Sequence, residues 1–294
     1  MRLSDAKLAI ILMTAPSFDP ITVALEEDIG AGDITSEFFV PATAQASAQI
    51  ITREKAIVAG TGTAAEVFHR VDPAIQIQVI REDGSEIAPG ETIIDLRGSA
   101  RSILRGERVA LNFLQRLSGI ATLTRKFVEA AGKHGVQILD TRKTTPGLRT
   151  LEKAAVVAGG GANHRFGLFD MVLVKDNHIV ARAGVSGIAD AVRRVRKERP
   201  EVRIEVEADH LDQVRTLLEI DDVDIILLDN MKPREMRKAV ALGKNKVKFE
   251  ASGGVTLKTV RKIAGTGVDY ISVGALTHSA PAINLSLEIK NVRP

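Results

Sequence analysis

From Gln137 onward, short β-type runs alternate with helical patterns, and this alternation restricts the possible folds more than any other feature. The β-type runs end at Asp140, Lys175, Glu207, Asp229, Glu250 and Val273. The helical patterns between them cover residues 148–158, 186–198, 211–220, 233–242 and 256–264. Alternating units of this length predict an α/β fold with a parallel sheet and right-handed crossovers. Six such units in succession favour an incomplete β/α barrel.

An open doubly wound sheet is the alternative architecture. A dinucleotide-binding sheet of that kind carries a Gly-x-Gly-x-x-Gly motif after its first strand. No such motif follows the run that ends at Asp140. The sequence therefore favours the barrel.

The first part of the chain has a different pattern. Asp19 followed by Pro20 is typical of an N-cap and a first helical residue, and predicts a helix from residue 20. Further β-type runs cover residues 48–52, 55–59, 75–80 and 92–96, and helices are predicted over 63–71, 99–117 and 122–133. This half is expected to form a small α+β layer on which residues 283–289 pack back.

Charged residues and glycines follow the β-type runs of the series. Because the carboxyl ends of parallel barrel strands converge on one mouth, these residues are expected to lie together. They are Arg142, Lys143, Lys175, Glu207, Asp229, Ser252, Gly253, Gly254, Gly274 and His278. Each alone has an ordinary explanation as a strand-end charge or a turn glycine, but the set predicts a ligand site.

The residue types indicate a ligand with two different ends. The cations near the first two strand ends are Arg142, Lys143, Arg165 and Lys175. They predict a multiply anionic ligand, whereas Arg149 and Lys153 are interpreted as solvated loop charges. Glycine turns after the last two strands leave backbone N–H groups open to a phosphate, and Glu207 with Asp229 offers oxygen ligands to Mg²⁺. The pattern predicts a phosphorylated sugar together with a small acid that has more than one carboxylate.

The helix predicted over 99–117 places Arg101, Arg105 and Arg108 on a common polar face. Such a stripe is usually the solvated side of a helix. Because charges of one sign repel each other, we expect an anionic group to face this stripe.

Composition excludes several classes of function. The net charge is +3, from 40 basic and 37 acidic residues, so the molecule as a whole is not a polyanion-binding surface. Aromatic residues make up 3% and tryptophan is absent, which leaves few stacking platforms for nucleic acid. The sequence has no cysteine, which excludes disulfides and thiol catalysis and fits a reducing compartment. We expect no nucleic-acid partner.

No apolar segment approaches the length of a transmembrane helix. The apolar run over residues 8–13 is shorter than the core of a secretory signal and is predicted to begin a first helix. We therefore expect a soluble, cytoplasmic protein with no membrane partner.

Eight segments carry a resemblance to a known family. In chain order they are ERVALNFLQRLSGIAT, DTRKTTPGLR, GGGANHRFGL, VLVKDNH, EVEAD, LLDN, EASGGV and SVGALTH. From around Leu25 onward the sequence resembles the quinolinate phosphoribosyltransferase family, the decarboxylating nicotinate-nucleotide pyrophosphorylases. The resemblance implies an N-terminal α/β sandwich over residues 1–117, with 279–294 packed back on it, and an open β/α barrel over 118–278. It also implies a homodimer or a larger assembly of dimers.

The resemblance further implies a reaction in which quinolinate and phosphoribosyl pyrophosphate give nicotinate mononucleotide, pyrophosphate and CO₂ in de novo NAD biosynthesis, with Mg²⁺ as cofactor. The residues that correspond to the quinolinate pocket are Arg108, Thr141, Arg142, His164, Arg165 and Lys175. Those that correspond to the phosphoribosyl pyrophosphate site are Lys143, Glu207, Asp229, Ser252, Gly253, Gly254, Gly274 and His278. Catalytic roles fall on Lys143, Lys175, Glu207 and Asp229, and the last two also hold Mg²⁺.

Two other functions are compatible with parts of the sequence. A paralogous family of the same fold, associated with molybdenum uptake, lacks parts of the quinolinate cluster that this sequence has at Arg142, His164, Arg165 and Lys175. A non-catalytic phosphosugar-binding protein would not need paired carboxylates such as Glu207 and Asp229 beside its phosphate turns. Both alternatives fit the sequence less well than the transferase.

Arg108 belongs to a helix outside the barrel series, yet the resemblance places it in the quinolinate pocket. A two-fold dimer can bring the helix of the partner subunit to a barrel mouth that the subunit's own helix does not reach. The sequence therefore predicts that Arg108 acts in trans.

Overall fold

The computed structural model describes residues 18–175, 178 and 187–293, which form two compact units. Unit 1 takes its described residues from 1–125, 144–160 and 276–294, and unit 2 from 126–143 and 161–275. Residues 144–160 thus cluster with unit 1, although they lie within the range 118–278 that the family resemblance assigns to the barrel. The helix expected from residue 8 and the start of another at Ser186 lie outside the described residues.

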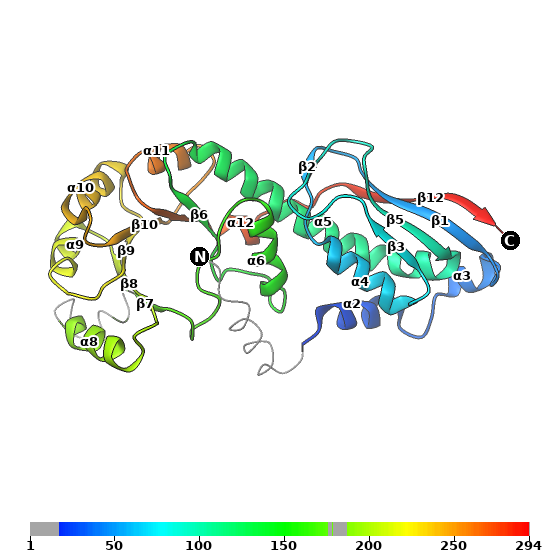
Figure 1. The fold of residues 1–294 in the computed structure, drawn as a ribbon, viewed down its shortest axis with the longest axis horizontal. Helices are drawn as coiled ribbons and strands as arrows, with labels where there is room; N and C mark the ends of the chain where they lie inside the picture. Colours follow the sequence, from blue (N-terminus) through cyan, green and yellow to red (C-terminus); the bar gives the residue numbers. More distant parts are fainter. Residues whose placement is uncertain (1–17, 176–177, 179–186, 294) are drawn as a thin grey trace. The chain divides into compact units, whose positions relative to one another are not determined.

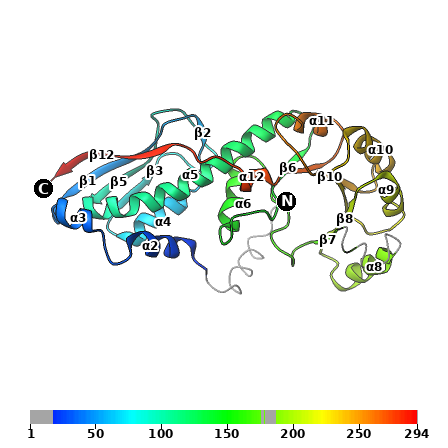
Figure 2. The same cartoon turned by 180° about the vertical axis from the view of Figure 1, so that it is seen from behind.

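Unit 1 is built on a four-stranded antiparallel sheet with the order β12-β1-β5-β3. Its strands are β1 (Gln45–Thr52), β3 (Gln76–Val79), β5 (Thr92–Ser99) and β12 (Leu285–Arg293), and a separate ladder joins β2 (Ala56–Ile57) to β4 (Glu86–Ile87). Figure 2 shows β12, from the C-terminal end of the chain, alongside β1, where Leu285 pairs with Thr52. The segment expected to pack on this half therefore adds an edge strand to its sheet.

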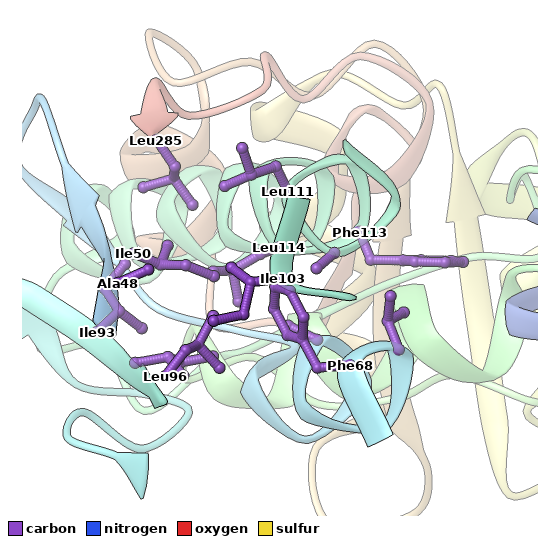
Figure 3. Close-up of a cluster of buried hydrophobic side chains, with 14 of the residues drawn as sticks. Ala48, Ile50, Phe68, Ile93, Leu96, Ile103, Leu111, Phe113, Leu114 and Leu285 are labelled. Atoms are coloured by element: carbon purple, nitrogen blue, oxygen red, sulfur yellow. The ribbon is translucent and has the colours of Figure 1, made fainter. Parts of the chain in front are cut away.

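Helices α4 (Thr61–Val71) and α5 (Ala100–Ala131) supply core residues that pack against the sheet of unit 1, which contains most of α5. The other helices described in this unit are α2 (Pro20–Ile29), α3 (Ile34–Phe39), α6 (Arg149–Ala158) and the end of α12 (Ala275–His278). Asp19 caps α2 as predicted, because its Oδ1 accepts the backbone N–H of Ile21 at 3.0 Å. In the core, Ile50 and Leu96 of the sheet lie beside Ile103 of α5 and Phe68 of α4, each at most 1% exposed (Figure 3). Full burial of such a side chain stabilises the fold by about 1.5–3 kcal/mol.

The long helix α5 corrects the prediction of two helices over 99–117 and 122–133. It is one helix of 32 residues that passes through the expected break at Ser118 and Gly119. The carbonyl of Pro281 occupies the place where a Cβ at Gly119 would stand, so this glycine permits a close approach. The hydroxyls of Ser118 and Thr122 accept the backbone N–H groups of Ala59 and Ile57, at 3.1 and 2.9 Å. The polar break is thus used for tertiary contacts, and the helix continues.

A buried carboxylate ties α5 to α6. Glu152 is 0% exposed, and its Oε1 accepts hydrogen bonds from Nη2 of Arg116 at 2.9 Å and from the hydroxyl of Thr145 at 2.7 Å. Arg116 also donates to the carbonyl groups of Thr277 and Ala280. This cluster fixes three segments that are far apart in the sequence.

Unit 2 contains a six-stranded parallel sheet, as the sequence predicts. Its strands are β6 (Gln137–Leu139), β7 (Val172–Val174), β8 (Ile204–Ala208), β9 (Ile225–Asp229), β10 (Lys248–Ser252) and β11 (Tyr270–Ser272). The helices between them are α8 (Ile188–Glu198), α9 (Leu211–Leu217), α10 (Pro233–Gly243) and α11 (Val260–Ala264), which lie around the outside of the strands in Figure 1. Strands β8 and β10 run one and two residues past the ends predicted at Glu207 and Glu250.

The strand order is β6-β11-β10-β9-β8-β7, so the first strand of the series pairs with the last. That order is the winding of a barrel, whereas a doubly wound sheet reverses direction at its centre. Among the described residues the sheet does not close, because β6 and β7 are its two edges. At the free edge of β6, Leu139 forms an isolated parallel β-bridge with Ala162. The architecture is the open barrel that the sequence predicts.

Across the residues that the structure describes, no helix is both long enough and apolar enough to cross a membrane.

Candidate functional site

Three carboxylates meet at the carboxyl ends of β8 and β9 in unit 2. Glu207 is 8% exposed, Asp229 is partly exposed and Asp209 is exposed. One oxygen from each lies within 4.8 Å of the others. Because the donors are all carboxylate oxygens, the group fits a hard cation such as Mg²⁺ better than a softer metal. The structure thus brings together the predicted pair and adds Asp209, which the sequence analysis did not single out.

Lys175, a member of the predicted cation cluster, lies close to one of these carboxylates. Its Nζ lies 3.8 Å from Oε2 of Glu207, and its side chain is 52% exposed. The backbone turns back at this point, because His178 donates its N–H to the carbonyl of Lys175 at 2.8 Å. Lys175 therefore stands at the end of β7, with its ammonium group near both solvent and Glu207.

Two arginines of unit 2 lie near enough to repel each other. Burial, followed by the positive charge of Arg142, lowers the pKa of Arg165, against the opposing charges of Glu205 and Asp170. Arg142 is exposed and Arg165 is partly buried. An anion that binds both arginines would reduce the repulsion between them, and guanidinium groups pair well with carboxylates.

Thr141 and Lys143 lie in the loop directly after β6. The backbone N–H of Lys143 donates to Oγ1 of Thr141 at 3.1 Å, and this bond forms a tight local turn. The side chain of Lys143 follows Arg142 on the same loop, and both residues are exposed. The loop thus presents two cations at the mouth of the sheet.

His164 points into the interior of unit 2 between two buried carboxylates. Its Nε2 lies 3.1 Å from Oε2 of Glu205 and 3.4 Å from Oε2 of Glu250. Side-chain exposure is 8% for the histidine, 0% for Glu205 and 1% for Glu250. Within the described part of the chain, neither carboxylate has a well-aligned hydrogen-bond donor.

Protonation of this cluster follows from its burial. Burial lowers the pKa of His164, but the close contacts of Nε2 with the two carboxylates and their negative charges outweigh it and raise the pKa to about 10. Burial and the charge of Glu250 raise the pKa of Glu205 to about 7, against the opposing effect of His164. However, Nδ1 of His164 accepts the backbone N–H of Arg165 at 2.7 Å, which only an unprotonated Nδ1 can do. We therefore favour a neutral ring, with the proton retained on a carboxyl group.

The glycine turn after β10 is shaped by a close contact with Asn230. The side chain of Asn230 fills the place of a Cβ at Gly253, whose φ of 93° is in the left-handed region. The N–H of Asn230 donates to the carbonyl of Ser252 at 3.0 Å, and its Nδ2 donates to Asp229 at 2.7 Å. Gly254 has φ 58° and no heavy atom within 4 Å of its Cβ position, so a phosphate can approach the backbone there. Gly274 follows β11 at the neighbouring strand end.

Several predicted residues fall in unit 1. Arg108 on α5 and His278 on α12 are exposed there. Arg101 donates to the carbonyl groups of Val40 and Glu37 at 2.7 and 2.9 Å, so this member of the stripe already has partners in its own unit. Lys153 is 2% exposed, which contradicts its interpretation as a solvated charge, because α6 turns this face into unit 1.

A cavity of about 370 Å³ lies between β7 and α8 and has Arg165 and His178 on its wall. Its other lining residues are mainly apolar, among them Met171, Leu173 and Ile188. A dicarboxylate would find only one of the clustered arginines there. The anion site is therefore assigned to the strand-end charges, and not to this cavity.

Four residues of this region were not predicted from the sequence as site residues: Glu205, Asp209, Asn230 and Glu250. Glu205 and Glu207 alternate along β8, which places them on one face of the sheet, and Asp209 directly after the strand continues the same spacing of two residues. That alternation was the available signal. Glu250 and Asn230 gave no comparable local signal, because their partners come from other strands.

Family models match both parts of the chain. Residues 33–118 match the model described as quinolinate phosphoribosyl transferase, N-terminal domain, and residues 120–288 match the model of its C-terminal domain. A probable nicotinate-nucleotide pyrophosphorylase (carboxylating) of Bacillus subtilis is 43% identical over 264 residues, which cover 90% of each chain. A chloroplastic nicotinate-nucleotide pyrophosphorylase (carboxylating) of Oryza sativa is 41% identical over 97% of this chain and 82% of that protein.

Solved structures give the same picture. The nicotinate-nucleotide pyrophosphorylase of Francisella tularensis has a TM-score of 0.86 at 41% identity and covers 92% of this chain and 95% of its own. The enzyme of the same name from Ehrlichia chaffeensis has a TM-score of 0.85 at 38% identity, and the match covers 99% of this chain and 100% of the Ehrlichia chain.

Proposed function

The chain belongs to the quinolinate phosphoribosyl transferase family, and we infer from this membership that it is a decarboxylating phosphoribosyltransferase of de novo NAD synthesis. Its substrates are quinolinate and phosphoribosyl pyrophosphate. Its products are nicotinate mononucleotide, pyrophosphate and CO₂.

One observation carries the proposal. In the parallel sheet of unit 2, three carboxylates meet at the carboxyl ends of β8 and β9, and Lys175 at the end of β7 lies 3.8 Å from Glu207. The same unit also holds Arg142 and Arg165 close enough for their charges to interact. The cations suit a dicarboxylate, and the carboxylates suit a metal that binds a diphosphate. A ligand-binding protein for only one of these groups would not need both clusters.

The cation cluster would hold quinolinate by its two carboxylates. Arg142, Arg165 and Lys175 are the candidates in unit 2, and the repulsion between the two arginines is offset when the dianion binds. Fixing both carboxylates orients the ring nitrogen toward C1 of the ribose, which reduces the entropic cost of attack. As the C–N bond forms, the bond to pyrophosphate breaks, and Lys143 offsets part of the charge on the leaving group.

Decarboxylation then needs no separate cofactor. The ring nitrogen is positively charged after the sugar is attached. When the carboxylate on the adjacent carbon leaves as CO₂, this nitrogen stabilises the electron pair that remains on that carbon, which then takes up a proton. The protein's part is to hold the other carboxylate and keep the ring in place.

Glu207, Asp209 and Asp229 would hold Mg²⁺, because three carboxylate oxygens within 4.8 Å form a suitable donor set. When bound, the ion would neutralise part of the diphosphate charge. The turn at Gly253 and Gly254 would hold the 5′-phosphate of the sugar through backbone N–H groups.

The subunit arrangement extends the proposal. We propose a homodimer, or an assembly of dimers, in which Arg108 completes the pocket of the partner subunit. In support, Arg108 is exposed on α5, and α3 presents Phe38 and Phe39 at 81% and 84% exposure, as expected of a surface that a second subunit covers. We also expect a cytoplasmic enzyme, since the absence of cysteine fits a reducing compartment.

Subunit exchange tests the role of Arg108. Mixing Arg108→Ala protein with Lys143→Ala protein should form heterodimers with one intact site, and random exchange should restore roughly a quarter of the wild-type sites. Inactivity of a mixture that is shown to contain heterodimers would mean that Arg108 does not act in trans.

The activity is tested by incubating the purified protein with quinolinate, phosphoribosyl pyrophosphate and Mg²⁺. Equal amounts of CO₂, nicotinate mononucleotide and pyrophosphate are expected. Folded protein that binds phosphoribosyl pyrophosphate without turnover would instead support the non-catalytic alternative. Folded protein that does not bind quinolinate would favour the paralogous family associated with molybdenum uptake.

A further inference from the structure

The loop that carries Arg165 is held by side chains rather than by a helix or strand. Four consecutive backbone N–H groups, of residues 164–167, donate to side-chain acceptors. Asp140 accepts the first at 2.9 Å, the ring of His164 accepts that of Arg165 at 2.7 Å, and Asp170 accepts the next two at 2.7 and 2.9 Å. The ring of His164 is therefore one of three supports that set the path of this loop.

The ring itself depends on Glu205 and Glu250. Their carboxylates lie 3.1 and 3.4 Å from Nε2, on strands β8 and β10 that flank β9. All three side chains are buried. If one carboxylate were removed, a water molecule could replace it as acceptor only by entering the interior of unit 2. These two carboxylates lie one layer below the mouth, since Glu205 shares a face of β8 with Glu207, and Glu250 shares a face of β10 with Ser252.

A metal ion bound by His164, Glu205 and Glu250 is the alternative to this arrangement, since one ligand atom from each residue lies within 4.8 Å of the others. A metal on Nε2 would require the ring proton to sit on Nδ1. That proton would face the N–H of Arg165 at 2.7 Å, donor against donor. The hydrogen bond at Nδ1 therefore favours a ring that carries its proton on Nε2, where it faces the two carboxylates.

We propose that Glu205 and Glu250 are positioning residues, which hold the His164 ring so that it fixes the backbone of Arg165 for binding of a substrate carboxylate. The proposal rests on the proposed function for the identity of that substrate. The carboxylates touch neither substrate in this arrangement. They act indirectly: they hold the His164 ring, and the ring holds the backbone amide of Arg165, from which the arginine side chain extends.

Two substitutions of Glu250 distinguish the effect of its acceptor oxygen from the effect of its side-chain volume. Glu250→Gln keeps an oxygen acceptor of similar reach, whereas Glu250→Leu keeps bulk and removes the acceptor. The leucine variant should bind quinolinate at least about tenfold more weakly, because a displaced binding group loses affinity steeply. It should bind phosphoribosyl pyrophosphate within about twofold of wild type, and the glutamine variant should restore most of the quinolinate affinity.

A control variant accounts for general destabilisation. Ile226 is 0% exposed on β9 and, by alternation with Ile225 and Leu227 in the register, faces away from the two carboxylates. Ile226→Ala should lower stability and leave quinolinate affinity unchanged. Equal quinolinate affinities for Glu250→Gln and Glu250→Leu, or a loss in Ile226→Ala as large as in Glu250→Leu, would overturn the proposal.

Two readouts do not depend on the reaction. In wild-type protein with ¹⁵N-labelled histidine, the His164 signals, assigned by loss in His164→Gln, should show a protonated Nε2 and an unprotonated Nδ1. Hydrogen exchange at the Arg165 amide should be slow in wild type and faster in Glu250→Leu. A proton on Nδ1, or unchanged exchange in the leucine variant, overturns the proposal even if Glu250→Leu weakens binding. Wild-type protein that fails to bind quinolinate would overturn the proposed function, while the ring tautomer and amide exchange still decide the positioning role.

Discussion

Replacing Arg165 with glutamine should weaken binding of one carboxylate of quinolinate and leave binding of its second carboxylate unchanged. Three ligands distinguish this outcome: quinolinate with both carboxylates, nicotinate with one, and picolinate with the other. If Arg165 pairs with a single carboxylate, the variant should lose affinity for quinolinate and for only the monoacid that keeps the same carboxylate. The second monoacid should bind the variant and wild type equally.

The expected magnitude follows from burial. Breaking a buried ion pair costs about 3–5 kcal/mol, but a hydrogen bond to a charged group contributes about 1.5–3 kcal/mol where solvent has access. Arg165 is only partly buried and Arg142 is exposed, so the lower range applies. Binding of the anion also relieves the repulsion between the two arginines, and the variant loses this benefit. We expect about 2 kcal/mol, or about a 30-fold change in Kd.

Isothermal titration calorimetry at one pH and salt concentration measures the three affinities. Arg194→Gln is a matched control, since Arg194 lies on α8 in the same unit, is 72% exposed and lies 3.8 Å from Glu198 on the same helix. This control should leave all three affinities unchanged. An Arg165→Gln variant that binds quinolinate as tightly as wild type, or weakens both monoacids equally, would refute the assignment.

Three further predictions concern the metal site, a buried ion pair and a helix cap. Glu207→Ala or Asp229→Ala should weaken phosphoribosyl pyrophosphate binding in Mg²⁺ by about tenfold or more while quinolinate affinity changes little, and equal loss of both would indicate a structural role. Glu152→Ala removes a fully buried acceptor of four hydrogen bonds and should lower the free energy of unfolding in urea by about 2 kcal/mol; a change below about 0.5 kcal/mol would contradict this. A hydrogen bond from Arg70 lowers the pKa of Asp19 despite slight burial, so its stabilising effect is present above the pKa of the unfolded chain and is lost as pH falls through the folded value. Asp19→Ala should therefore cost about 1 kcal/mol at pH 7 and progressively less below about pH 4 in thermal unfolding.

The barrel units and their polar ends could be predicted because their signals are local. A β-type run followed by a charge or a glycine is visible within a few residues, and the rule that strand ends converge then brings distant positions together. Lys175, Glu207 and Asp229 were found in this way. Asp209 could also have been predicted, since it comes directly after β8 and continues the spacing of Glu205 and Glu207.

Other features depend on partners that no local pattern identifies. Ser118 and Gly119 have the composition of a helix break, but contacts with Ala59 and Pro281 keep the helix continuous. Glu205 and Glu250 can be recognised as a pair only once β8 and β10 are known to flank β9. Tertiary contacts decide these cases, so sequence propensity alone could not.

The pairing of first strands with last ones has a consequence for biosynthesis. In unit 2, β6 pairs with β11, and in unit 1, β1 pairs with β12, so Arg53 reaches Ser286 across 233 residues. During synthesis neither sheet is complete until the C-terminal end of the chain has been made. Until then β1 offers an unpaired edge, which is a site for mispairing and aggregation. Contacts of such long range also slow folding, because the loop must close before the strands can pair. A nascent chain of this protein therefore depends on its final strand to complete one unit, and on its last barrel strand to complete the other.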